Sequence, residues 1–177
     1  MTDTYPNART IAVVADCHIH PPRIAFPDAA LAAMAGVDLI VTLGDMGETS
    51  GLDQLAAIAP VVGVLGEDDQ PDPRTAPKAR VIEAGGLRFG CVFDPVVNGL
   101  AARKEPFAWV LDAEAAETGL FGGQIDMLLH ASTHVAEVFA DGRAVNPGSL
   151  TLPSDGQRAF AIIEIAGGKA AARIVRV

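Results

Sequence analysis

The chain has 177 residues, half of them hydrophobic and a fifth charged, which is enough for one domain with a buried core. Its 13 Lys and Arg residues against 22 Asp and Glu residues give a net charge of −9. This charge argues against non-specific binding to nucleic acids and to anionic membranes, because both require a basic surplus. The two cysteines are too few for a disulfide framework, and neither a leader sequence nor a long apolar run is visible. We therefore expect a cytoplasmic protein with reduced thiols.

The first half of the chain alternates between predicted strands and predicted helices. Short, continuous apolar runs are typical of strands that are buried on both faces. Such runs occur at Ile11–Ala15, Leu39–Leu43 and Val61–Leu65. Between them, Asp28–Gly36 and Gly51–Ala59 are predicted helices. This order of elements predicts a parallel sheet.

The second half is predicted to be rich in antiparallel strand pairs. Glycine-containing turns predict three hairpins, which pair Arg80–Glu83 with Leu87–Phe93, Val135–Ala140 with Arg143–Val145, and Arg158–Ile165 with Ala171–Val177. The remaining predicted elements are a loop at Gln70–Pro77, a helix at Ala108–Thr118 and a buried strand at Asp126–His130. The expected fold class is α/β, a sandwich of two sheets flanked by helices, in a single domain spanning residues 1–177.

Carboxylates and histidines follow several predicted strands at the point where each strand ends. The carboxyl ends of parallel strands meet at one edge of a sheet, so we expect these side chains to form one cluster. Its expected members are Asp16, His18, Asp45, Glu67, Asp68, Asp69, His130 and His134, with His20 beside them. Mixed carboxylate and imidazole ligands suit Mn²⁺, Fe²⁺, Ni²⁺ or Zn²⁺. Helix capping and turn formation are the alternative for each of these residues taken singly.

Five short motifs resemble those of the calcineurin-like metallophosphoesterases, in the same order, from about Ile11 to Ser149. They are Asp16-Cys17-His18 for D-x-H, Gly44-Asp45 for G-D, Gly66-Glu67-Asp68-Asp69 for G-N-x-D, Ala131-Ser132-Thr133-His134 for G-H-T-H, and Asn146-Pro147-Gly148-Ser149 for N-P-G-S. The length of the chain is similar to that of the small bacterial and archaeal phosphodiesterase branch, which includes the retromer subunit of the same fold. The resemblance implies the two-sheet fold and a divalent metal centre.

The resemblance implies an intact first metal site and an altered second one. Asp16, His18, Asp45 and His134 match the ligands of the first site, and Asp45 matches the residue that bridges two ions. At the second site Glu67 replaces an asparagine, Ser132 replaces a histidine, and Phe93 stands where another histidine is expected. Glu67 could still hold an ion with Asp45, with Asp94, His20 and His130 near the same crevice. We expect one ion, Mn²⁺, Fe²⁺, Ni²⁺ or Zn²⁺, rather than two.

Asp45 and Asp68 are the expected catalytic residues. Asp68 matches the position of a general acid in larger relatives, and a carboxylic acid among carboxylates can have a raised pKa. Loop capping is the alternative for Asp68 and Asp69. No arginine closely follows the N-P-G-S motif, which weakens the expected binding of phosphate. Cys17 is expected to pack in the core rather than to act as a nucleophile.

The expected function is hydrolysis of a small phosphoester substrate by a metal-dependent phosphoesterase, specifically a phosphodiesterase. The alternative is a catalytically weakened scaffold of the same fold that binds a protein. The intact first site favours the enzyme, whereas the missing histidines and arginine favour the scaffold. A second copy of the chain and a different protein are both open as macromolecular partners.

Overall fold

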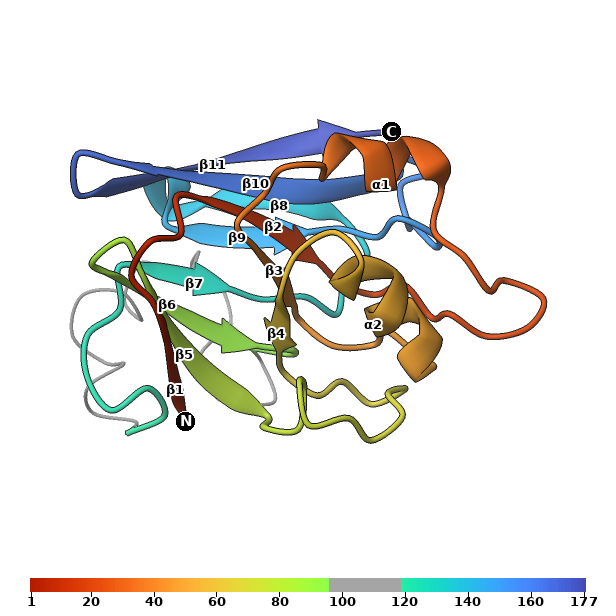
Figure 1. Cartoon of the computed structure of the whole chain (residues 1–177), viewed down its shortest axis with the longest axis horizontal. Helices are drawn as coiled ribbons and strands as arrows, with labels where there is room; N and C mark the ends of the chain where they lie inside the picture. Colours follow the sequence, from red (N-terminus) through yellow and green to blue (C-terminus); the bar gives the residue numbers. More distant parts are fainter. Residues whose placement is uncertain (96–118) are drawn as a thin grey trace.

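The computed structural model describes residues 1–95 and 119–177, which form two packed sheets (Figure 1). The predicted helix at Ala108–Thr118 lies outside the described residues. Within them, a five-stranded sheet has the order β11-β10-β2-β3-β4, and a six-stranded sheet has the order β1-β5-β6-β7-β9-β8. The predicted α/β sandwich of two sheets is therefore confirmed.

The five-stranded sheet contains the predicted strand–helix repeat of the first half of the chain. Strands β2 (Thr10–Val14), β3 (Leu39–Thr42) and β4 (Val61–Gly63) are parallel, with α1 (Asp28–Ala33) and α2 (Thr49–Ala56) between them in the chain. The C-terminal hairpin of β10 (Ala159–Ala166) and β11 (Lys169–Arg176) completes this sheet, because β10 pairs antiparallel with β2.

The six-stranded sheet contains the other two predicted hairpins. Strands β5 (Ala79–Ala84) and β6 (Leu87–Val92) form one of them. Strands β8 (Ala136–Phe139) and β9 (Ala144–Pro147) form the other, across the 3-10 turn η2 (Ala140–Gly142). Strand β7 (Met127–Leu129) lies between the hairpins and is parallel to both of its neighbours.

Strand β1 (Thr2–Tyr5) was not predicted, and it pairs in parallel with β5 at the edge of the six-stranded sheet. Its side chains alternate between exposed and half-buried positions, so it lacks the continuous apolar run by which the other strands were recognised. Arg80 on β5 donates a 2.7 Å hydrogen bond to Asp3, and this guanidinium is almost fully buried. The ion pair therefore ties the first strand to the sheet.

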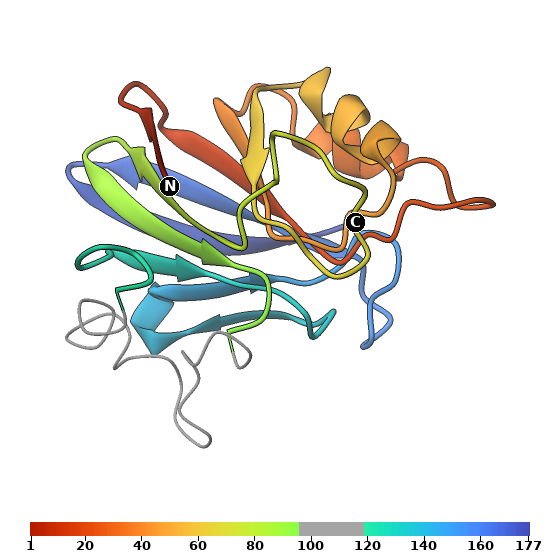
Figure 2. The ribbon, with the colours of Figure 1, turned by 90° about the horizontal axis from the view of Figure 1, so that it is seen from below.

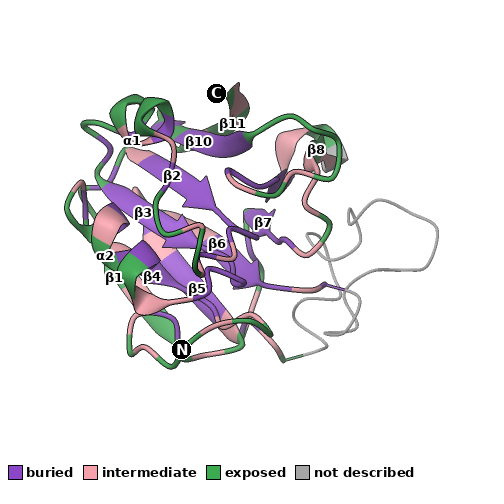
Figure 3. Cartoon of the chain, turned by 90° about the vertical axis from the view of Figure 1, so that its right-hand side faces the viewer, coloured by how far each residue is buried: buried purple, intermediate pink, exposed green. Residues whose placement is uncertain are grey.

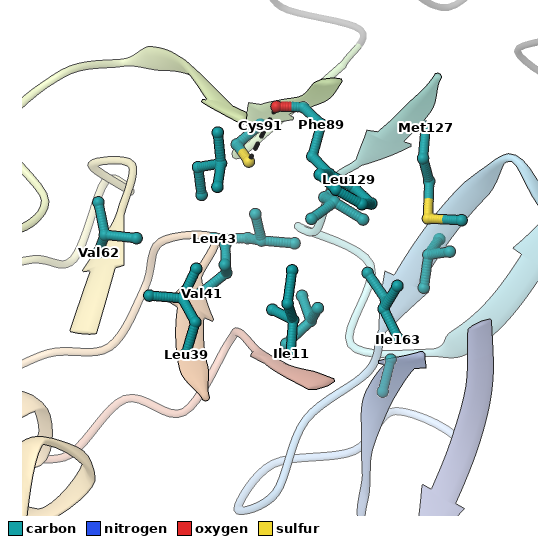
Figure 4. Close-up of a cluster of buried hydrophobic side chains, with 14 of the residues drawn as sticks. Ile11, Leu39, Val41, Leu43, Val62, Phe89, Cys91, Met127, Leu129 and Ile163 are labelled. Carbon is teal, nitrogen blue, oxygen red and sulfur yellow. Dashed lines mark hydrogen bonds between the residues drawn. The ribbon is translucent and has the colours of Figure 1, made fainter. Parts of the chain in front are cut away.

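The main core lies between the two sheets, and a second core lies under the helices. On β2, Ile11 and Val13 face the other sheet, whereas Ala12 and Val14 face α1 and α2. This division explains why the strand reads as an uninterrupted apolar run. Figure 4 shows the inter-sheet core, where Ile11 lies near Leu39, Val41 and Leu43.

Both described helices cover the same outer face of the five-stranded sheet (Figure 2). Figure 3 shows that the strands beneath them are buried while much of each helix surface is exposed. Cys17 and Cys91 are free thiols in the buried interior, and burial raises the pKa of both. The prediction that Cys17 packs in the core is confirmed. None of the helices within residues 1–95 and 119–177 has the length and apolarity needed to span a membrane.

Candidate metal centre

The loops that follow β2, β3 and β7 carry the four residues predicted for the first metal site and are hydrogen-bonded to one another. The amide of Asp16 donates to the carbonyl of Gly44 at 3.1 Å, and the amide of His18 donates to the carbonyl of Asp45 at 2.9 Å. The carboxylate of Asp16 then accepts hydrogen bonds of 3.3 Å from the amides of Ser132 and His134. These hydrogen bonds link the loops after β2, β3 and β7, which come from distant parts of the chain.

The N-P-G-S turn forms hydrogen bonds to the loops that carry Asp16 and His134. The Ser149 hydroxyl donates a 2.7 Å hydrogen bond to the carbonyl of Asp16. The side-chain amide of Asn146 donates to the Thr133 hydroxyl at 3.0 Å, and its carbonyl oxygen accepts from the amide of Gly148 at 3.0 Å. Asn146 and Ser149 therefore shape the turn, and Ser149 also positions a candidate ligand.

The two histidines of this group are held by one ring nitrogen each. His134 Nδ1 lies 2.8 Å from the carbonyl oxygen of Leu152, and His18 Nδ1 lies 2.5 Å from Asp68 Oδ2. Both partners are acceptors, so Nδ1 is the donor in each pair and Nε2 is the nitrogen left to face a ligand. Histidines that bind metals are oriented in this way by a carbonyl or carboxylate. His18 Nε2 is 3.6 Å from Asp45 Oδ2, and the two imidazole rings stack with centroids 5.2 Å apart.

Asp16, His18, Asp45 and His134 all have left-handed backbone conformations, with φ between 43° and 59°. Among the described non-glycine residues, only Ser132 and Asp141 share this property. A left-handed L-residue costs about 1–2 kcal/mol, and such strain concentrates at functional sites. The strain coincides with the four predicted ligands of the first site.

Asp16 is fully buried, and the chemistry of its surroundings fits a cation. Burial raises the pKa of Asp16 to about 6, although the charge of His134 and hydrogen bonds from the His134 and Ser132 amides lower it. A divalent cation beside the carboxylate would offset this cost of burial. Two carboxylates and two imidazole Nε2 atoms also form a donor set that suits Mn²⁺, Fe²⁺, Ni²⁺ and Zn²⁺.

The residues expected around the second metal site lie in different environments, some exposed and some buried in the core. Glu67 is exposed, and within the described part of the chain it makes no hydrogen bond or ion pair. Phe93 is buried in the inter-sheet core, beside Gly44. His130 is buried and stacks on Phe139, and burial lowers its pKa to about 4, with Asp94 acting in the opposite direction. Phe93, at the position where the resemblance implies a histidine, therefore belongs to the inter-sheet core.

Asp69 caps the loops, as the alternative for this residue predicted. Its carboxylate accepts hydrogen bonds from the amides of Met46 at 2.5 Å, Gly47 at 3.1 Å and Gly66 at 2.7 Å. The same carboxylate therefore joins the loop after β3 to the loop after β4. Asp68 differs, because its amide donates to Asp45 Oδ1 at 2.9 Å while its own carboxylate points toward two histidines.

His20 was predicted to lie beside the cluster but not as one of its ligands, and it contacts the same carboxylate as His18. Its Nε2 lies 2.7 Å from Asp68 Oδ2, and potential ligand atoms of His18, His20 and Asp68 all lie within 4.8 Å of one another. The available signal was the spacing His18-x-His20, which places two imidazoles on one side of an extended segment. The expected raised pKa of Asp68 is wrong: burial does raise it, but hydrogen bonds from both histidines outweigh that effect and lower it.

Comparisons with known proteins agree on one family and one fold. A model of the calcineurin-like phosphoesterase superfamily domain matches residues 10–168. A probable metallophosphoesterase of Methanothermobacter thermautotrophicus is 28% identical over 169 residues, which cover 94% of this chain and 91% of that protein.

Two solved structures show how far the fold extends. Vps29 of Chaetomium thermophilum has a TM-score of 0.70 at 23% identity, with 96% of this chain and 97% of that chain covered. A novel archaeal phosphodiesterase has a TM-score of 0.63 at 17% identity, with 94% and 99% covered. At these identities the two structures demonstrate a shared fold over nearly the whole chain.

Proposed function

Because this chain belongs to the calcineurin-like phosphoesterase superfamily, we propose that it is a metal-dependent phosphodiesterase with a single principal metal site. The observation that carries the proposal is the left-handed backbone shared by Asp16, His18, Asp45 and His134. Backbone strain concentrates at functional sites, and joint binding of one cation would account for four such residues on three loops.

Asp16, His18, Asp45 and His134 would hold the ion, and Mn²⁺, Fe²⁺, Ni²⁺ or Zn²⁺ matches their donor atoms. Such an ion supplies Lewis-acid activation of water and of phosphoryl oxygens. Asp45 presents its Oδ2 toward His18 while its Oδ1 accepts from the Asp68 amide, so its carboxylate is oriented at both oxygens.

Asp68 has a positioning role in this proposal. Its carboxylate fixes His18 through Nδ1, and its lowered pKa keeps it ionised at neutral pH. An ionised acceptor strengthens the hold on the imidazole and makes Nε2 a better ligand. Asp68 also lies beside Asp45 at the exposed rim of the site, where it can contact a bound phosphoester.

Hydrolysis of bis-p-nitrophenyl phosphate by metal-stripped protein, with and without added Mn²⁺, tests the proposal. We expect Mn²⁺-dependent turnover that Asp45→Asn abolishes, because the substitution removes a charged ligand. Glu164→Gln is the matched control, since Glu164 pairs with Thr10 at the opposite end of β2 and should leave turnover unchanged. Absence of turnover with Mn²⁺, Fe²⁺, Ni²⁺ and Zn²⁺ would overturn the phosphodiesterase proposal.

A protein-binding scaffold is the second candidate function. Two features of the expected second site favour it: Phe93 lies in the core where the family resemblance implies a ligand, and Glu67 is exposed without a polar partner among the described residues. Leu152 is also 39% exposed, and its carbonyl accepts from the candidate ligand His134. Loss of metal-dependent turnover, combined with retained metal binding, would favour this function over the enzyme.

A further inference from the structure

A pocket of about 220 Å³ beside the candidate metal centre is lined by two arginines, Arg23 and Arg158. Arg23 belongs to the segment after β2, and Arg158 immediately precedes β10. The rest of the lining includes the buried, apolar side chains of Phe26 and Leu150. The pocket thus combines two cationic groups with an apolar wall.

Direct contacts connect this pocket to the metal centre. Arg23 Nη1 donates a 2.7 Å hydrogen bond to the carbonyl of His18. Thr151, which also lines the pocket, donates its hydroxyl to the carbonyl of Cys17. The next residue, Leu152, accepts the hydrogen bond from His134. The pocket is therefore built on the same loop segments that position two candidate ligands.

The charge environment of these two arginines differs from that of four other arginines in the described part of the chain. Arg74, Arg80, Arg88 and Arg173 each form a salt bridge with a carboxylate. Within residues 1–95 and 119–177, no carboxylate lies within salt-bridge distance of Arg23 or Arg158. In a chain of net charge −9, two uncompensated guanidinium groups in one pocket form a local site for an anion.

We propose that this pocket binds a second phosphate group, one that is not cleaved, on a phosphodiester substrate; this inference rests on the proposed function. Guanidinium groups match phosphate because they offer paired donors in a planar fork. One donor of Arg23 is used on His18, which leaves the others available for the ligand. The apolar wall of Phe26 and Leu150 would contact the organic part of the substrate beside that phosphate. Arg23 and Arg158 would thereby replace the arginine that is missing after the N-P-G-S motif.

The binding step is tested on metal-free protein by titration with inorganic phosphate, followed through backbone amide NMR signals. We expect saturable changes in the amide chemical shifts of Arg23, Thr151 and Arg158. The Arg158→Gln substitution should strongly reduce these changes. Arg173→Gln is the matched control, because Arg173 is exposed and pairs with Glu164 on a neighbouring strand. Arg23→Gln provides a second variant, although it also removes the bond to His18. Absence of saturable shifts, or shifts that both pocket variants leave unchanged, would overturn the proposal.

The substrate step is tested with a dinucleotide that carries or lacks a 5′-phosphate. We expect Arg158→Gln to raise KM about tenfold for the phosphorylated dinucleotide only, because one charge-assisted contact is lost. An equal rise in KM for both dinucleotides would overturn the assignment to a second phosphate. If neither dinucleotide is hydrolysed while bis-p-nitrophenyl phosphate is, the assignment to a second substrate phosphate fails and the proposed function stands. The NMR titration decides separately whether the pocket binds phosphate.

Discussion

His18 and Asp68 are joined by a hydrogen bond of 2.5 Å between Nδ1 and Oδ2, although 50 residues separate them in the chain. The same oxygen of Asp68 also accepts from His20 at 2.7 Å. A carboxylate after β4 thus sets the orientation of a candidate metal ligand that follows β2. Asp68 would therefore orient the candidate ligand His18 without binding the metal ion itself.

Replacement of Asp68 is therefore expected to weaken metal binding even though the four first-site ligands remain. Asp68→Ala should lower the affinity for Mn²⁺ by about 10–100-fold, the range typical for residues that orient metal-bound histidines. Isothermal titration calorimetry with metal-stripped protein measures the change, and Glu164→Gln serves as the charge-matched control. An unchanged affinity would show that Asp68 does not position His18 for the ion.

The left-handed backbone at His134 predicts that glycine is more stabilising than alanine at this position, whereas the reverse is expected at a position in a regular strand. His134→Gly and His134→Ala both remove the imidazole, but only glycine tolerates a φ of 59° without strain. The glycine variant should be more stable than the alanine variant by about 0.5–1 kcal/mol, since strain relief exceeds the entropic cost of glycine.

Urea denaturation of the metal-free variants measures this difference in the free energy of unfolding. Glu137, which lies on strand β8, is the control position. There the alanine variant should be the more stable of the pair, because glycine weakens a regular strand. The same ranking at both positions would contradict the strain at His134.

The stability of the fold should depend on pH through Asp38. Hydrogen bonds from the amides of Arg9 and Thr10 lower the pKa of this carboxyl group. A lowered pKa in the folded state means that the stabilisation is present above the ordinary pKa of about 4 and is lost as the pH falls below it. Asp38→Asn should therefore be less stable than the wild type at pH 7. This difference in the free energy of unfolding should become smaller toward pH 3.

Urea unfolding of both proteins across this pH range measures the difference, and asparagine is a near-isosteric neutral replacement. A difference that stays constant from pH 7 to pH 3 would rule out Asp38 as a source of pH dependence.

Gly66 is expected to tolerate no side chain, because it lies against the candidate ligand Asp45. A Cβ atom at Gly66 would come within 2.1 Å of the Asp45 amide nitrogen and 2.4 Å of Asp45 Oδ1. Gly66→Ala should therefore displace Asp45 and lower both the affinity for Mn²⁺ and the stability. Gly86→Ala is the matched control, since a Cβ there meets no atom within 4 Å and only its φ of 85° is unfavourable. Equal metal affinity in both variants would contradict this packing argument.

Much of the fold was predictable because local patterns and tertiary structure agree. The continuous apolar runs at Ile11–Ala15 and Leu39–Leu43 correspond to strands that have a core on each face. The Asp141-Gly142 turn was readable because both residues adopt left-handed conformations that aspartate and glycine accept more easily than most residues. Strand β1 was missed because its stability depends on pairing with β5 and on the ion pair between Asp3 and Arg80.

By itself, the sequence determined which polar residues follow the strand ends, and its motifs, through the family resemblance, predicted Asp16, His18, Asp45 and His134 as ligands of one centre. Only the tertiary structure decided the partners of those residues. Asp68 orients His18, Leu152 orients His134, and Arg23 and Arg158 share a pocket beside them. The physical reason is that strand periodicity is local and visible in a linear pattern, whereas side-chain hydrogen bonds between loops depend on how distant segments pack together.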